Sequence, residues 1–173
     1  HQLVPGHPIA GSEKSGVNAA LSNLFEGHRV ILTPTEETAT KHFDRVIALW
    51  EGVGAAVSCM DVTRHDEILA ATSHLPHLLA FSLVDTLAAR SDYQEIIKFA
   101  AGGFRDFTRI AASDPIMWRD ITLANKIAIL GILDDVMSDL NALRNAVRDA
   151  NEAYLLDAFN QAQEARQRHE KQL

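Results

Sequence analysis

The spacing of apolar residues changes near residue 60, and this change limits the fold more than any other feature of the sequence. Before it, short runs such as residues 30–32 are apolar almost without interruption, which is typical of strands covered on both faces. Beyond it, apolar residues recur with the period of an α-helix. We therefore expect a mainly α protein, in which an all-α region over residues 61–173 follows a smaller region with strands, residues 1–60.

Residues 28–60 are expected to form one βαβ unit. A strand over residues 30–34 is followed by a helix that Thr35 opens and a glycine pair ends, and residues 55–60 return as a second buried strand. The helix places its large apolar side chains on one side: Phe43, Val46, Ile47 and Trp50. Because this unit is too small to be a domain alone, its sheet partners are expected upstream or in another chain.

Charge and cysteine content exclude several classes of function. Sixteen Lys and Arg against twenty-three Asp and Glu give a net charge of −7, with no basic stripe, which argues against nucleic acid as a partner. Cys59, the single cysteine, has no neighbours spaced for zinc and is expected in the core of a protein from a reducing cytoplasm. The chain begins with His1 and shows no export leader, so we expect a piece of a longer chain.

A long apolar segment over residues 64–89 is expected to be a central helix, packed inside a dimer. Thr63 is expected to cap its start, with Asp66 reaching back, and Pro76 to kink its middle. The segment is long enough to cross a bilayer, but it contains residues that are costly in lipid: His74, Pro76, His77 and Asp85. A soluble core helix is therefore expected rather than a membrane span.

Shorter helices should follow. One begins at Asp92 and ends at a glycine pair, Gly102 and Gly103, which can take positive φ and admit a ligand or another backbone. Ser113-Asp114-Pro115 is a strong helix start, since a capping side chain precedes proline. Beyond residue 129 the apolar period predicts long packing helices, with a polar, solvated end over residues 161–171.

Several polar residues leave alternatives open. His74 and His77 lie one turn apart on the apolar helix and either are satisfied structurally or face a polar ligand; no further cluster suggests a metal. Arg105 and Arg109 lie among phenylalanines and either pair with a buried carboxylate, from Asp66 or Asp106, or bind an anionic ligand. Two glycine patterns, over residues 11–16 and 52–57, do not fit a P-loop or a dinucleotide-binding turn, respectively.

The segment Pro5-Gly6-His7-Pro8-Ile9-Ala10-Gly11-Ser12-Glu13-Lys14-Ser15-Gly16 closely resembles the signature of the prephenate dehydrogenase family, which includes cyclohexadienyl and arogenate dehydrogenases. Four further segments resemble motifs of this family and occur in the family's order: residues 30–34, 73–77, 102–109 and 113–120. The resemblance covers residues 1 to about 125, and the remainder matches only as helical.

The resemblance implies a Rossmann domain that binds NAD or NADP, followed by an all-α domain that forms a homodimer. Residues 1–60 would be the C-terminal remnant of the Rossmann domain, and residues 61–173 the dimerisation and substrate-binding domain. The main cofactor loop would lie upstream of His1, so this chain alone should be inactive. The implied reaction is oxidative decarboxylation of prephenate or arogenate in tyrosine biosynthesis, with inhibition by tyrosine left open. The alternative is a non-catalytic helical dimerisation module or the tail of another 2-hydroxy-acid dehydrogenase.

The same resemblance implies roles for individual residues. His7 would be the catalytic base, because a neutral imidazole can accept the substrate's hydroxyl proton. Arg109 and His77 would bind the substrate, with Gly102 in the adjoining turn and Arg105 reaching the neighbouring subunit's substrate. The supporting residues would be Asp66 and Trp118, which hold Arg109, together with His74 and Glu13. No metal is expected.

Overall fold

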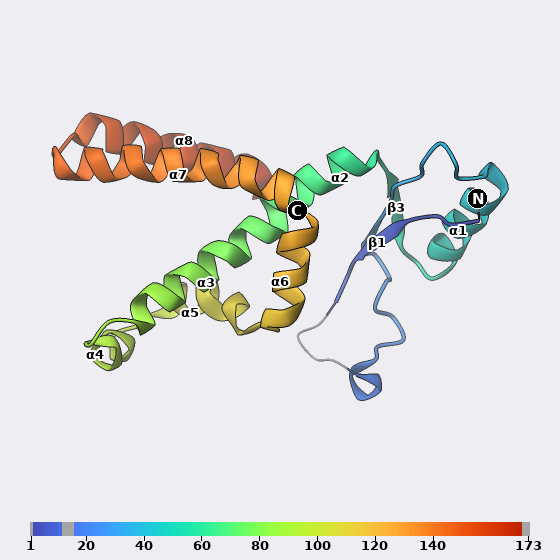
Figure 1. Cartoon of the computed structure of the whole chain (residues 1–173), viewed down its shortest axis with the longest axis horizontal. Helices are drawn as coiled ribbons and strands as arrows, with labels where there is room; N and C mark the ends of the chain where they lie inside the picture. Colours follow the sequence, from blue (N-terminus) through green and yellow to red (C-terminus); the bar gives the residue numbers. More distant parts are fainter. Residues whose placement is uncertain (1, 12–15, 171–173) are drawn as a thin grey trace. The chain divides into compact units, whose positions relative to one another are not determined.

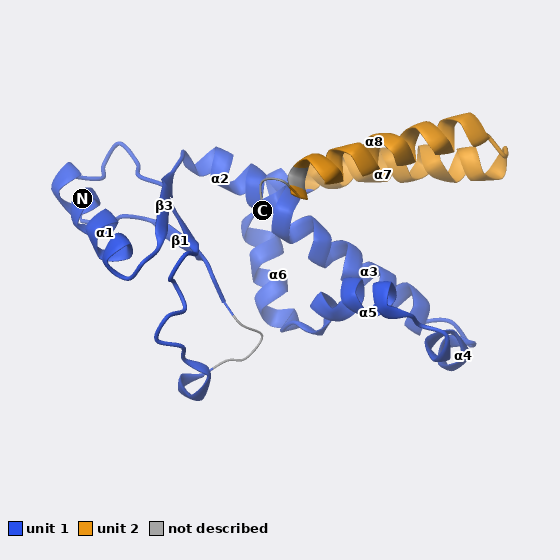
Figure 2. Ribbon diagram, turned by 180° about the vertical axis from the view of Figure 1, so that it is seen from behind, with its two compact units in different colours: residues 1–129 blue, residues 130–173 orange. Residues whose placement is uncertain are grey.

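A computed structural model describes residues 2–11 and 16–170 of the chain (Figure 1). It confirms a mainly α protein, with a three-stranded sheet near the N-terminus followed by helices. The contacts divide the chain into two compact units, residues 1–129 and 130–173 (Figure 2). This division falls later than the domain boundary at residue 60, which stays a prediction.

The sheet has the order β1-β2-β3. Strand β2 (Arg29–Leu32) pairs in parallel with β3 (Ala56–Cys59), and α1 (Thr40–Gly52) connects them, which confirms the predicted βαβ unit. The sequence did not predict β1 (Gly6–Ile9), which pairs antiparallel with β2 and places His7 opposite Ile31. Because β1 is an edge strand, Pro8 fits there without a backbone N–H.

Two predictions for this region are wrong. The helix begins at Thr40 instead of Thr35, because the Thr35 N–H donates to Thr38 Oγ1 at 3.0 Å and forms a local turn that competes with helix. Cys59 is exposed because it ends β3, which is also an edge strand of the described sheet. The core contains Val30, Leu32 and Ala55, and the partly buried residues packed against it include the predicted helix face: Phe43, Val46, Ile47 and Trp50.

The long apolar segment is not one continuous α-helix. It consists of α2 (Val62–Leu69), a π-helical turn η2 (Ala70–His74), and α3 (Leu75–Ala88). Pro76 therefore lies in the first turn of α3, where a missing N–H is tolerated, instead of in mid-helix. The predicted cap at Thr63 is wrong, since the residue before the helix is Asp61 and its carboxylate accepts the Arg64 N–H at 2.9 Å.

The segment Val62–Ala88 is long and apolar enough to cross a membrane by length and composition alone. Within it, His74 is buried and hydrogen-bonded to Asn125, a polar contact that suits packing against protein and is costly in lipid. Only 22% of its most apolar window is buried. A single copy of the chain therefore leaves most of this window exposed, and the central position inside a dimer stays a prediction.

Four short helical elements follow in the first unit: α4 (Tyr93–Lys98), α5 (Gly102–Thr108), the 3₁₀ turn η3 (Arg109–Ala112) and α6 (Pro115–Ala124). The cap before α6 is confirmed, since the Asp114 carboxylate accepts the N–H groups of Ile116 and Met117. The predicted helix end at the glycine pair is wrong, because α4 ends at Lys98 and Gly102 and Gly103 begin α5 with negative φ.

The second unit is a helical hairpin made by α7 (Lys126–Arg148), whose first turn belongs to unit 1, and α8 (Glu152–Glu170), as Figure 2 shows. The two helices turn at Ala150, which has a φ of 49°. Ala146 is buried in this unit. Large apolar side chains of the predicted packing helices nevertheless stay exposed, among them Leu130, Met137, Leu140, Leu156 and Phe159.

Candidate active site

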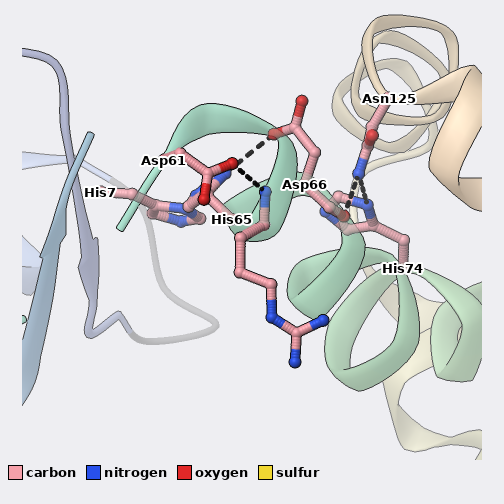
Figure 3. A network of polar contacts seen from close by, with 7 residues as sticks. His7, Asp61, His65, Asp66, His74 and Asn125 are labelled. Carbon is pink, nitrogen blue, oxygen red and sulfur yellow. Dashed lines mark hydrogen bonds and ion pairs between the residues drawn. The ribbon is translucent and has the colours of Figure 1, made fainter. Parts of the chain in front are cut away.

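Two histidines from separate elements meet beside the sheet (Figure 3). His7 extends from β1, and its Nδ1 lies 2.9 Å from Nε2 of His65 on α2. The other ring nitrogen of His65, Nδ1, lies 2.8 Å from Oδ1 of Asp66. Figure 3 shows His7 and His65 at the sheet end of a network that continues to Asn125 and His74. The strand missed by sequence analysis thus carries the predicted catalytic residue.

Asn125 joins the start of this network to the π-helical turn. It lies just after α6, and its side-chain nitrogen donates to the Asp66 carbonyl at 2.8 Å and approaches His74 Nδ1 at 3.1 Å. Because the carbonyl only accepts, the amide nitrogen must face it, and its second hydrogen then points to His74. His74 Nδ1 is therefore unprotonated, and burial, followed by the nearby charge of His7, lowers the pKa of His74.

Trp118 on α6 packs against both histidines of the apolar segment. The His77 ring stacks on the indole with a centroid distance of 3.6 Å, and the His74 ring meets it edge-on at 6.2 Å. His77 Nδ1 donates to the Ser73 carbonyl at 2.9 Å, which leaves Nε2 of the neutral ring as an acceptor. The Trp118 indole N–H is buried and meets no acceptor among the described residues, so it can donate to a ligand.

The predicted substrate-binding residues lie on elements that pack against α3, the helix of His77. Gly102 and Arg105 belong to α5, Arg109 begins η3, and both elements contact α3. Arg105 and Arg109 are both exposed. Glu13 lies outside the described residues. The roles assigned to all of these residues stay predictions.

Sequence analysis missed two members of the network, His65 and Asn125. No sequence pattern singles out His65, and without β1 nothing places it beside His7. Asn125 carries no sequence signal, because a polar residue after a helix is ordinarily a solvated helix end. Among the described residues, no group of three His, Cys, Asp or Glu side chains converges as a metal site.

The site suits proton transfer at His7. Burial and the charge of His65 lower the pKa of His7, so that its imidazole is neutral at pH 7 and can act as a base. Exposed arginines near His77 supply positive charge on a protein of net charge −7, which favours an anionic ligand at this place. The arrangement can bind an anion and accept a proton from it.

Comparison with known families assigns both parts of the chain. The family described as "Prephenate dehydrogenase, nucleotide-binding domain" matches residues 1–59, and the family described as "Prephenate dehydrogenase, dimerization domain" matches residues 61–161. Together these two matches cover nearly the whole chain, including the network around His7.

Curated relatives agree with this assignment. A cyclohexadienyl dehydrogenase of Zymomonas mobilis is 40% identical over 96% of this chain and 57% of its own length. A prephenate dehydrogenase of Bacillus subtilis is 41% identical over 96% of this chain and 45% of its own length. The chain therefore spans about half the length of the curated relatives it matches.

Solved structures share the fold. A prephenate dehydrogenase from Aquifex aeolicus, in complex with hydroxyphenyl propionate and NAD⁺, superposes with a TM-score of 0.87 at 47% identity, covering 95% of this chain and 58% of that one. A Synechocystis arogenate dehydrogenase superposes with a TM-score of 0.85 at 26% identity, over 97% of this chain and 62% of that one. The chain belongs to the prephenate dehydrogenase family.

Proposed function

We propose that this chain is the C-terminal part of a cytoplasmic, NAD- or NADP-dependent dehydrogenase that decarboxylates prephenate or arogenate oxidatively, yielding 4-hydroxyphenylpyruvate or tyrosine. The observation that carries the proposal is the position of His7, which lies within the family signature and has its Nδ1 2.9 Å from His65 Nε2, where burial lowers the pKa of His7. A neutral, positioned imidazole is the group needed to accept a hydroxyl proton near pH 7.

His7 takes part in the reaction as a base. As hydride leaves the ring carbon that bears the hydroxyl, His7 accepts the hydroxyl proton and the carbonyl forms. The ring carboxylate then leaves as CO₂, its bonding electrons make the ring aromatic, and the phenolate oxygen takes a proton back. A bound nicotinamide supplies the hydride acceptor.

The substrate carries carboxylate groups, which explains the cations near α3. Arg109 would bind a substrate carboxylate in a bidentate manner, with His77 and Gly102 beside it and Arg105 reaching the neighbouring subunit's substrate. Asp66 and Trp118 would hold Arg109 in place. The supporting roles of His74 and Glu13 are part of the same proposal.

This chain would supply only part of the cofactor-binding fold. The parallel β2-α1-β3 unit fits the end of a nucleotide-binding fold, but the glycine pattern near Gly54 lies between a helix and a strand. Gly54 instead packs closely on Glu26, whose Cγ would lie 3.2 Å from an added Cβ. We therefore place the phosphate-binding turn, and the choice between NAD and NADP, upstream of residue 1.

The exposed apolar residues of α7 and α8 support a homodimer, as does the exposed part of the Val62–Ala88 segment. A second copy would cover these surfaces and bring Arg105 of one subunit to the substrate of the other. Tyrosine, which shares the product's ring and carboxylate, is proposed as an inhibitor of the same site.

The proposal is tested with the protein expressed together with the coding sequence upstream of residue 1. Nicotinamide reduction is followed by absorbance with prephenate and arogenate in turn, each with NAD and with NADP. Turnover that disappears in His7→Asn and persists in His28→Asn, which changes an exposed histidine, supports the proposal. A folded dimer without turnover on either substrate refutes it and favours a non-catalytic helical module.

A further inference from the structure

We propose that His65, backed by Asp66, is a positioning residue that fixes the tautomer of His7 and leaves Nε2 of His7 as the free base. The inference rests on the proposed function only in calling His7 the base. The hydrogen-bond geometry that carries it comes from three side chains on β1 and α2.

The carboxylate of Asp66 can only accept hydrogen bonds. Because Oδ1 lies 2.8 Å from His65 Nδ1, that nitrogen carries the hydrogen and donates it. In a neutral imidazole one nitrogen donates and the other accepts. His65 Nε2 is therefore a lone-pair acceptor that faces β1.

The acceptor on His65 determines which ring nitrogen of His7 carries the hydrogen. Its Nδ1 lies 2.9 Å from His65 Nε2, and two lone pairs at that distance would repel each other, so His7 Nδ1 must carry the hydrogen. Nε2 of the neutral His7 is then unprotonated. When Nε2 accepts a proton, the Nδ1–H bond to His65 is unchanged, so proton transfer requires no rearrangement of the contacts among His7, His65 and Asp66.

Ring geometry and burial support this order of donors. The two imidazole rings are tilted by 57° with centroids 5.2 Å apart, so their nitrogens meet without face-to-face stacking. The His65 side chain is 18% exposed, whereas the Asp66 side chain is 41% exposed. His65 is therefore the better shielded of the two, and it connects His7 on the edge strand β1 to α2.

Two replacements of His65 separate its role from simple packing. His65→Leu removes the acceptor, whereas His65→Gln keeps an acceptor, since the glutamine Oε1 can occupy the position of Nε2. His28→Leu is the matched control, because His28 is exposed and bonds only locally, to the Glu26 carbonyl in the described structure. Each variant is made in the protein expressed with its upstream sequence, and thermal unfolding checks that it folds.

The first readout is ¹⁵N NMR of histidine-labelled protein, which distinguishes protonated from unprotonated ring nitrogens. The expected result in the unchanged protein above the pKa of His7 is a protonated Nδ1 and an unprotonated Nε2. In His65→Leu the two tautomers of His7 mix, and in His65→Gln the original one returns. A His7 protonated mainly at Nε2 in the unchanged protein overturns the proposal, even when His65→Leu does not fold.

The second readout is kinetic. His65→Leu should lower kcat about 10- to 100-fold with little change in KM, the order expected when a reacting group loses its orientation, and His65→Gln should restore most of the loss.

The two proposals fail in distinguishable ways. Unchanged kcat and tautomer in a folded His65→Leu variant overturn the role of His65 while leaving the dehydrogenase assignment intact. Absence of turnover on either substrate, together with a His7 tautomer that depends on His65, refutes the dehydrogenase assignment and supports the positioning role of His65.

Discussion

Replacing Asn125 by leucine would remove the side chain that joins α2 to the π-helical turn. The amide nitrogen donates to the Asp66 carbonyl at 2.8 Å and to His74 Nδ1 at 3.1 Å. One substitution therefore removes the donor to His74 Nδ1, whereas the Asp66 carbonyl keeps the backbone N–H of Ala70. Leucine has a similar volume and creates no large cavity. The change therefore isolates the two hydrogen bonds better than alanine would.

The magnitude follows from the burial of the two acceptors. An unsatisfied buried acceptor costs about 1–3 kcal/mol. His74 is 9% exposed and should approach the middle of this range, whereas Asp66 is partly exposed and its carbonyl can gain water. Because only His74 Nδ1 is left unsatisfied, the predicted decrease in the free energy of unfolding is about 1–3 kcal/mol.

Urea unfolding at fixed protein concentration measures this decrease. Asn23→Leu is the matched control, since Asn23 is exposed and a surface change of this kind stays within about 0.5 kcal/mol. The pKa of His74, measured by NMR, should also rise in Asn125→Leu, because the lost donor favoured the neutral ring. Equal stabilities for the two leucine variants would refute the hydrogen-bond reasoning.

Three further predictions concern single residues. Because the pKa of His74 is lowered in the fold, the unfolded chain binds its proton more readily, so stability falls as pH drops below about 6.5; His74→Phe should flatten this part of a urea-midpoint profile, and an unchanged slope would contradict the argument. Asp114→Ala removes the cap of α6 and should cost about 0.5–2 kcal/mol in urea unfolding, whereas no loss would mean that solvent replaces the cap. Arg109→Ala should weaken substrate binding by about 2–4 kcal/mol, measured as KM, and an unchanged KM would remove it from the site.

Much of the architecture could be predicted because it depends on the local spacing of apolar residues and on helix-capping residues. The βαβ unit and the start of α6 follow from apolar runs and from Asp114-Pro115, and both are confirmed. Strand β1 could not be predicted because Gly6 and Pro8, two of its four residues, are uncommon in strands, and its stability comes from pairing with β2. The exposed Cys59 was missed for a similar reason, since an apolar run does not tell an edge strand from a central one.

The candidate site was predictable only in part. The family signature identified His7 directly, and α6 and α3 bring Trp118 and His77 into a stack. The contact between His7 and His65 depends on how β1 meets α2, across 58 positions of sequence, and no local pattern encodes it. The tautomers follow only from the contacts, because Asp66 fixes one ring and that ring fixes the next.

The π-helical turn at Ala70–His74 has a consequence for the phase of the helix. Such a turn holds one residue more than an α-turn, and each residue advances a helix by about 100°. Deleting one residue from this turn would rotate everything after it against α2, so that the side of α3 bearing His77 would face away from Trp118. The extra residue thus sets the angle between α2, whose His65 contacts His7, and α3, which packs against the elements that carry the arginines.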